Sequence, residues 1–262
     1  MSDLLLIQNA LRDAIRPRRL LIALLLTFLP PALGLGSRLL TPQEAFVPND
    51  VYDGLVVSLV FSFALVILAV VNGTGVVSQE VEGRTIVYLL TRPFPRWRIL
   101  LSKFVVALFL TGIITTLSTL LLALAVYGMN WREAGVISDI RALWMGSLAY
   151  TALFLLLGTA LPRPLTYGLL FVFGWETWVP KLPGQFARIS VMTYLRAISQ
   201  RKISGDPSQT SSNILLSFAR PPVIDISVGQ AWLILALISV VCLAAALVVF
   251  SVREYSPRED AE

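Results

Sequence analysis

Long charge-free stretches separate the charged positions of this chain. Five of them cover 20–37, 54–79, 104–131, 142–162 and 226–252, and each holds between 18 and 28 residues. A helix needs about 20 mostly apolar residues to cross the hydrocarbon core of a bilayer. The pattern therefore predicts five strong membrane-spanning helices. A weaker sixth lies between Arg163 and Lys181, where 17 residues include Glu176 near the far end.

We place the predicted spans at about 20–37, 54–77, 104–128, 142–161, 164–180 and 228–251. The first contains Pro30 and Pro31, and proline removes a backbone donor, so we expect that helix to kink or to end there. Ahead of it, apolar residues recur at helical spacing, which predicts an amphipathic helix lying in the membrane interface over 1–19. The segment 181–227, between the last two spans, is predicted to be external.

Lysine and arginine alternate between the two sides of the predicted membrane. The segment before the first span and the loop between spans two and three hold nine of them, whereas the loops after spans one and three hold three. Cytoplasmic loops carry the excess of positive charge, so the N-terminus is predicted to be cytoplasmic. The segment after the weak span holds six more, so charge counting alone favours five spans. Trp175 and Trp178 stand where an interfacial aromatic belt would end a crossing, which favours six.

The composition agrees with a membrane protein and excludes several kinds of chemistry. Hydrophobic residues make up 56% of the 262 positions and charged residues 14%, against about 25% charged in soluble domains. The chain has no histidine, which excludes histidine-dependent zinc sites and Ser-His-Asp triads. Its one cysteine, Cys242, has no partner for an internal disulfide. We predict no catalytic residue, no metal site and no nucleic-acid partner.

The segment 78–103 between spans two and three holds seven charged residues. Glu80 and Arg84 are four apart in the order that favours a helical ion pair, and Pro93 and Pro95 would end that helix. The pattern predicts a short cytoplasmic helix, charged on one side and apolar on the other, held between two membrane-spanning helices. Judged by charge alone, an ordinary loop that obeys the positive-inside rule is the simpler interpretation.

The order of residues in this segment resembles the membrane subunits of type-2 ABC exporters. The resemblance implies that this segment forms the coupling helix that docks on the ATPase. We assign ATPase coupling to Glu80, Glu82, Gly83, Arg84, Thr85, Leu89, Leu90, Pro93, Arg96 and Lys103. The whole layout is similar as well, with an interfacial N-terminal helix, six spans and a long external segment before the last one. We therefore predict six spans, with both termini cytoplasmic.

The resemblance also implies the partners. The chain would be a single permease domain over 1–262, all-α, in the plasma (inner) membrane. Two such subunits, identical or related, would pair with two ABC ATPase subunits and move a substrate outward. The chain contains no G-x-x-x-x-G-K-[ST] phosphate loop, so ATP and Mg²⁺ would bind the separate ATPase. We expect no cofactor on this chain and no enzymatic activity of its own.

The predicted spans give little information about the substrate. The absence of Asp, Glu, Lys and Arg from the five strong spans argues against proton- or sodium-coupled transport, and we expect a lipophilic or amphipathic substrate. Side chains that could line a pathway are those of Thr111, Thr115, Ser118, Thr119 and Glu176. Small hydroxyl residues commonly pack membrane helices together, which is the plainer role for the first four.

Two other classes stay open at this point. A non-transporting anchor or scaffold subunit of a larger membrane complex would show the same pattern, and a channel is the second alternative. An intramembrane aspartyl enzyme would need two facing acids within the spans. We expect Asp53, at the edge of the second span, to have no such partner.

Overall fold

The computed structural model describes residues 17–42, 46–82, 96–179, 184–201 and 226–252, and every regular element in these ranges is helical. Five helices are long and apolar enough to cross a membrane: Leu20–Leu40, Pro48–Val76, Trp97–Arg132, Val136–Ala160 and Val228–Val252. They correspond to the five strong predicted spans. An all-helical chain with five candidate membrane spans is therefore confirmed for the described residues.

The elements follow one another with few breaks. The helices are α2 (Pro17–Leu40), α3 (Pro48–Leu55), the π-helix η1 (Val56–Leu65), α4 (Val66–Glu82), α6 (Arg96–Tyr127), the 3-10 helix η2 (Gly128–Ala134), α7 (Val136–Ala160) and α11 (Val228–Val252). Helices α3, η1 and α4 run on directly as the second candidate span. Gly135 joins η2 to α7 with a φ of 63°, a left-handed conformation that glycine adopts without steric cost.

The helices differ from the predicted spans at their ends. Of the two outcomes expected at Pro30 and Pro31, a kink or an end of the helix, the second does not occur, because α2 continues to Leu40. Prolines are tolerated in membrane helices where neighbouring groups satisfy the freed carbonyls. Helices α6 and α7 also begin several residues before the predicted spans, because charged residues such as Lys103 and Asp139 lie within the helices and not in loops.

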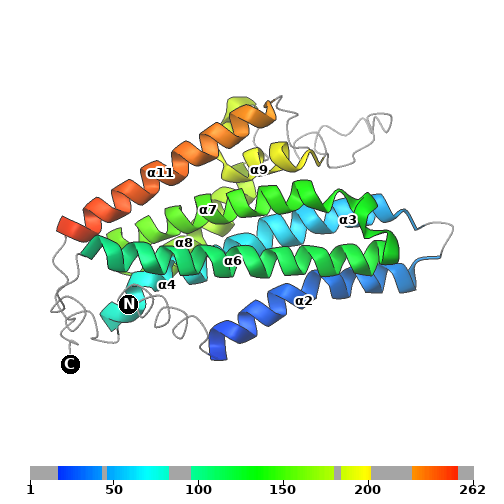
Figure 1. Cartoon of the computed structure of the whole chain (residues 1–262), viewed down its shortest axis with the longest axis horizontal. Helices are drawn as coiled ribbons and strands as arrows, with labels where there is room; N and C mark the ends of the chain where they lie inside the picture. The colour runs from blue at the N-terminus through cyan, green and yellow to red at the C-terminus, as the bar shows by residue number, and fades with distance from the viewer. Residues whose placement is uncertain (1–16, 43–45, 83–95, 180–183, 202–225, 253–262) are drawn as a thin grey trace.

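Helix α7 is the centre of the bundle. It packs against α4, α6 and α11, and α2 packs against α6. Figure 1 shows α2 and α11 on opposite sides, with α6 and α7 side by side between them. The inward face of α7 carries Leu143, Tyr150, Phe154 and Leu155, all fully buried. The outer helices α2 and α11 keep long rows of exposed apolar side chains, as expected for surfaces that face lipid or another subunit.

Helices α4 and α7 come unusually close. A Cβ atom added at Gly73 would lie 2.9 Å from Cβ of Phe154 and 3.2 Å from the carbonyl oxygen of Thr151. One added at Gly158 would lie 3.2 Å from the carbonyl oxygen of Thr74. Small residues allow membrane helices to approach backbone to backbone. The two helices therefore form a tightly packed pair along their shared length.

The weak sixth span is replaced by shorter pieces. Helix α8 (Pro164–Leu170) runs into the π-helix η3 (Phe171–Glu176), and helical turns continue to residue 179. At about 1.5 Å per residue this run is about 24 Å long, and it is not one of the five candidate spans. The 3-10 helix η5 (Gly184–Ile189) and helix α9 (Val191–Ser199) follow. Six spans therefore stay a prediction.

Several predictions lie outside the described residues. The interfacial helix was expected over 1–19, of which 1–16 are outside and 17–19 belong to α2. Of the predicted coupling segment 78–103, residues 78–82 belong to α4 and 96–103 to α6, and 83–95 lie outside the described residues. The predicted external segment 181–227 is described over 184–201, and there α9 packs onto α7 and α11.

Candidate functional site

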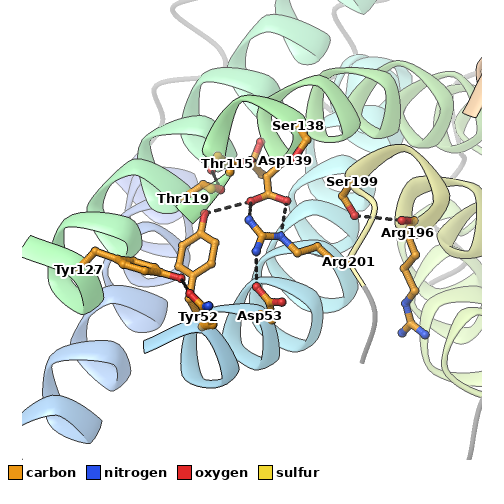
Figure 2. A network of polar contacts seen from close by, with 12 residues as sticks. Tyr52, Asp53, Thr115, Thr119, Tyr127, Ser138, Asp139, Arg196, Ser199 and Arg201 are labelled. Carbon is orange, nitrogen blue, oxygen red and sulfur yellow. Dashed lines mark hydrogen bonds and ion pairs between the residues drawn. The ribbon is translucent and has the colours of Figure 1, made fainter. Parts of the chain in front are cut away.

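Arg201 binds acidic side chains from two different helices (Figure 2). Its Nε donates to Oδ1 of Asp139 at 3.1 Å, and its Nη2 donates to Oδ2 of the same carboxylate at 2.8 Å. Its Nη1 donates to Oδ1 of Asp53. The Asp139 side chain is fully buried, whereas those of Arg201 and Asp53 are 12% and 23% exposed. A two-point contact of this kind fixes the orientation of both partners.

Tyr52 completes the group, which we call the Arg201 cluster (Tyr52, Asp53, Asp139 and Arg201). The Tyr52 hydroxyl donates to Oδ2 of Asp139 at 3.0 Å, and Cζ of Arg201 lies 4.8 Å from the centre of the tyrosine ring. That ring is fully buried and meets Tyr127 edge-on, with 5.6 Å between ring centres. The cluster thus joins the start of the second candidate span, the start of α7 and the residues that follow α9.

The charges of the cluster stabilise one another. Burial alone would lower the pKa of Arg201, but the hydrogen bonds and charge of Asp139, together with the charge of Asp53, raise that pKa above its ordinary value. Arg201 therefore keeps its positive charge. A guanidinium between two carboxylates prevents them from sharing a proton as an aspartyl dyad does. The arrangement ties the start of α7 to the start of the second candidate span.

Sequence reasoning missed this cluster. Asp53 was expected to lack the facing acid of an aspartyl enzyme, and its ion pair with Arg201, which also binds Asp139, was not foreseen. Asp139 was placed in a loop, since the charge-free criterion started the fourth span at residue 142. The only signal in the sequence was that acidic residues and Arg201 fall in segments expected on the same side of the membrane, and that signal does not pair individual residues.

The four predicted pathway residues of α6, Thr111, Thr115, Ser118 and Thr119, lie inside the bundle and are fully buried. Nδ2 of Asn72 on α4 donates to Oγ1 of Thr111 at 3.1 Å, and Oγ of Ser118 donates to the carbonyl oxygen of Leu26 on α2 at 3.4 Å. The hydroxyls of Thr115 and Thr119 donate to carbonyl oxygens of their own helix. These contacts hold α2, α4 and α6 together, and the lining of a pathway by these residues stays a prediction.

Glu176 is the last residue of η3 and is 8% exposed. Its carboxylate accepts hydrogen bonds from Oγ of Ser190 and from the backbone nitrogen of Val191, the latter at 3.2 Å. Ser190 Oγ in turn accepts from the nitrogen of Met192. Glu176 thus caps the N-terminus of α9, where a carboxylate is favoured by the helix dipole. Its role in a pathway stays a prediction.

The predicted coupling residues surround a loop that joins two neighbouring helices. Glu80 and Glu82 belong to the last turn of α4, Arg96 is the first residue of α6, and Lys103 lies two turns further on. Helices α4 and α6 pack against each other. The remaining coupling residues fall outside the described ranges: Gly83, Arg84, Thr85, Leu89, Leu90 and Pro93.

The end of α4 and the start of α6 lie at the opposite end of the bundle from the Arg201 cluster (Figure 1). Helix α6 begins beside the loop and ends at Tyr127, whose ring touches Tyr52 of the cluster. Its 32 residues span about 48 Å at 1.5 Å per residue. Helix α7 runs the other way, from Asp139 in its first turn to Ala160 at the loop end. The chain between Ala160 and Arg201 therefore returns from the loop end to the cluster end.

The comparison with known families decides the class of this protein. A model of the ABC-2 family of transporter proteins matches residues 15–172. The chain belongs to the ABC-2 transporter family. The match confirms the resemblance inferred from residues 78–103, and it includes Asp53, Asp139 and the hydroxyl residues of α6. Arg201 and Glu176 lie beyond it. Among curated proteins, none matches the chain.

Family membership carries several consequences. This ABC-2 protein is a membrane permease subunit of an ABC transporter and a multi-pass membrane protein, and the family implies an ABC ATPase as its partner. Permeases of this family are typically non-catalytic.

Proposed function

We propose that this ABC-2 permease is the membrane subunit of an exporter that moves a lipophilic or amphipathic substrate outward across the plasma membrane. Two permease subunits, identical or related, pair with two ATPase subunits. ATP and Mg²⁺ bind to the ATPases, and this chain binds no cofactor. The loop 78–103 and both termini lie in the cytoplasm, and the Arg201 cluster lies on the outer side.

The observation that carries this proposal is that α4 ends and α6 begins on either side of the predicted coupling residues, and that these two helices pack against each other. Residues 83–95 connect the ends of α4 and α6, and both helices pack along α7. Close backbone contact at Gly73 and Gly158 makes α4 and α7 move together. A push on the loop by a closing ATPase would therefore tilt three helices at once.

The ends of these helices opposite the coupling residues carry the contacts that we expect to change during transport. Asp53 stands at the start of the second candidate span and Asp139 at the start of α7, and Arg201 holds them together. Interfaces of packed helices switch between discrete arrangements, and breaking an ion pair is one such switch. We propose that opening to the outside separates these three residues.

Charge reversals at the loop test the coupling. Glu82→Lys and Arg96→Glu should each weaken recovery of the ATPase with the tagged permease and lower the ATPase activity of the purified membranes, because docking of charged partners depends on complementary charge. Arg132→Glu is the matched control, since it makes the same change at an exposed position at the cluster end. If both loop variants recover and stimulate the ATPase like the wild type, the coupling assignment is wrong.

The alternative functions make a different prediction for the same variants. A scaffold or anchor subunit has no need of the charges at 80–96 for ATP-driven work, and a channel needs no ATPase at all. Insensitivity of every loop variant, with normal membrane insertion, would favour those classes.

A further inference from the structure

The second candidate span changes its helical geometry partway along its length. Residues Val56–Leu65 form the π-helix η1 between the α-helices α3 and α4. Its wider turn is visible in a side-chain contact, because Oγ of Ser62 donates to the carbonyl oxygen of Val57, five positions back, at 2.8 Å. In α4, Oγ1 of Thr74 donates to the carbonyl oxygen of Val70, four positions back, as in an ordinary α-helix. π-helices are rare, mostly single turns, and frequent at functional sites.

Helix α6 contacts this span at two levels, one on either side of η1. Nδ2 of Asn72 donates to Oγ1 of Thr111 at 3.1 Å. The Tyr127 hydroxyl donates to Oδ1 of Asn49 at 2.5 Å. The two contacts are 23 positions apart on the second span, from 49 to 72, but only 16 apart on α6, from 111 to 127. Helix α6 is α-helical between them, so they are separated by about 24 Å along it.

Helix α7 shows the same difference. It runs parallel to the second span, and the Tyr52 hydroxyl donates to Asp139 at the cluster end. At the loop end, the carbonyl oxygen of Thr74 lies against Gly158. These contacts are 22 positions apart on the second span, from 52 to 74, and 19 apart on α7, from 139 to 158. The π turns accommodate the surplus, because an i→i+5 hydrogen bond encloses one residue more than an i→i+4 bond.

The sequence of η1 permits α turns as well. Residues 56–65 include neither proline nor glycine, so every backbone nitrogen there can donate to a carbonyl oxygen either four or five positions back. A change between the two forms exchanges one set of internal hydrogen bonds for another. Backbone groups inside a bilayer must stay satisfied in this way. Shifts of a helix between discrete packings are an established form of conformational switching.

We propose that η1 is an adjustable joint in the second candidate span. When its π turns change to α turns, the span lengthens and rotates, and Tyr52 and Asp53 leave their partners in the Arg201 cluster. The close contacts of Gly73 and Gly158 hold α4 on α7, so the change in length appears at the cluster end. This inference rests on the proposed exporter function and deepens it by naming the element that releases the cluster.

Single-residue deletions test whether η1 holds surplus length. Ser58 is exposed on η1, and Leu117 is 47% exposed on α6; each lies between the two contacts that join the second span to α6. A deletion in an α-helix rotates the flanking residues by about 100° relative to each other, so deletion of Leu117 must break one of these contacts. Deletion of Ser58 should convert a π turn to an α turn and keep both.

The melting temperature of the purified full-length permease measures the difference. We expect deletion of Leu117 to lower it by about 5 °C or more, and deletion of Ser58 by about 2 °C or less. Arg201→Gln should cause the same further loss with and without Ser58, because the Arg201 cluster stays formed. If deletion of Ser58 costs as much as deletion of Leu117, or prevents folding, η1 holds no surplus length and the joint is refuted.

The motion is measured on the chain without a deletion. In a Cys242→Ala background, spin labels at Asp50→Cys on α3 and Ile137→Cys on α7 report the distance between these helices at the cluster end, where both positions are exposed. Met129→Cys with Ile137→Cys is the control pair, since the short helix η2 joins these two positions. Trapping the complex of permease and ATPase with ATP and vanadate should lengthen the first distance and leave the control distance unchanged.

Failure of the joint and failure of the exporter function give different results. A trapped complex with an unchanged first distance would overturn the joint and leave the exporter function standing. Recovery of the permease without any ATPase would count against the exporter function. In that case the deletion pair still decides whether η1 is adjustable, because the melting temperatures do not depend on the ATPase.

Discussion

Arg201 and Asp139 are 62 positions apart in the sequence, and they form a two-point ion pair at one end of the bundle. Asp139 opens α7, and Ala160 closes it at the other end. The ion pair therefore brings residue 201 back to the level at which α7 begins. This contact shows that the interrupted segment between them traverses the length of the bundle.

The Arg201 ion pairs should contribute strongly to stability. Arg201→Gln leaves the fully buried Asp139 carboxylate without its cation, and breaking a buried pair costs about 3 kcal/mol or more. Asp53→Asn should cost less, about 1 kcal/mol or below, because the Asp53 side chain is 23% exposed. The free energy of unfolding in mixed detergent micelles measures both. Equal stability of Arg201→Gln and the wild type would contradict the role of the cluster.

Because Ala160 and Arg201 lie at opposite ends of the bundle, we expect residues near them on opposite sides of the membrane, and cysteine labelling can test this. In a Cys242→Ala background, single cysteines replace four exposed residues, Asn130, Gln200, Arg98 and Arg163. A membrane-impermeant maleimide added to intact cells should label Asn130→Cys and Gln200→Cys. It should label the other two only after the membrane is permeabilised. Labelling of Gln200→Cys together with Arg163→Cys would show that the segment does not cross.

The sequence predicted the candidate spans well, because a helix that crosses a membrane needs a continuous run of apolar residues, and such a run is visible in the sequence. Charge-free runs of 18 to 28 residues gave all five candidate spans. Their ends were less accurate, since Lys103 and Asp139 lie in helical turns beyond the apolar runs. The Arg201 cluster could not be predicted from the sequence. Arg201 is 62 positions from Asp139 and 148 from Asp53, and contacts between residues so far apart leave no local sequence pattern. Between Arg163 and Lys181, the short apolar run with Glu176 near its end and the positive charges that follow it made the weaker span ambiguous.

Close packing of α4 on α7 predicts that alanine at Gly73 destabilises the protein, whereas alanine at Gly36 on α2 does not. In Gly73→Ala the new Cβ would meet Phe154 at 2.9 Å, so the helices must separate at a cost of about 1–3 kcal/mol. Gly36→Ala on α2 is the matched control, since a Cβ there meets nothing within 4 Å. Alanine favours helix by about 1 kcal/mol over glycine, so the control should be neutral or stabilising. Unfolding measurements that rank the two variants in the opposite order would contradict the close approach.

Thr111 and Thr119 on α6 should differ in their contribution to stability although both are fully buried. Thr111→Val removes the acceptor of the interhelical hydrogen bond from Asn72 and should cost about 1 kcal/mol of unfolding free energy. Thr119→Val removes a hydroxyl that donates to Thr115 of its own helix and should cost only a few tenths of that amount. Both changes are isosteric, so equal losses would argue against the interhelical bond as the source of stability.

The most direct test of the account is recovery of the tagged permease from its native membrane in mild detergent, with the co-purifying proteins identified and their ATPase activity assayed. We predict a stoichiometric partner that carries a phosphate loop and hydrolyses ATP, and loss of that partner in the loop variants Glu82→Lys and Arg96→Glu. Repeated recovery of the permease without any ATPase, under conditions that keep known transporter complexes intact, would contradict the exporter function.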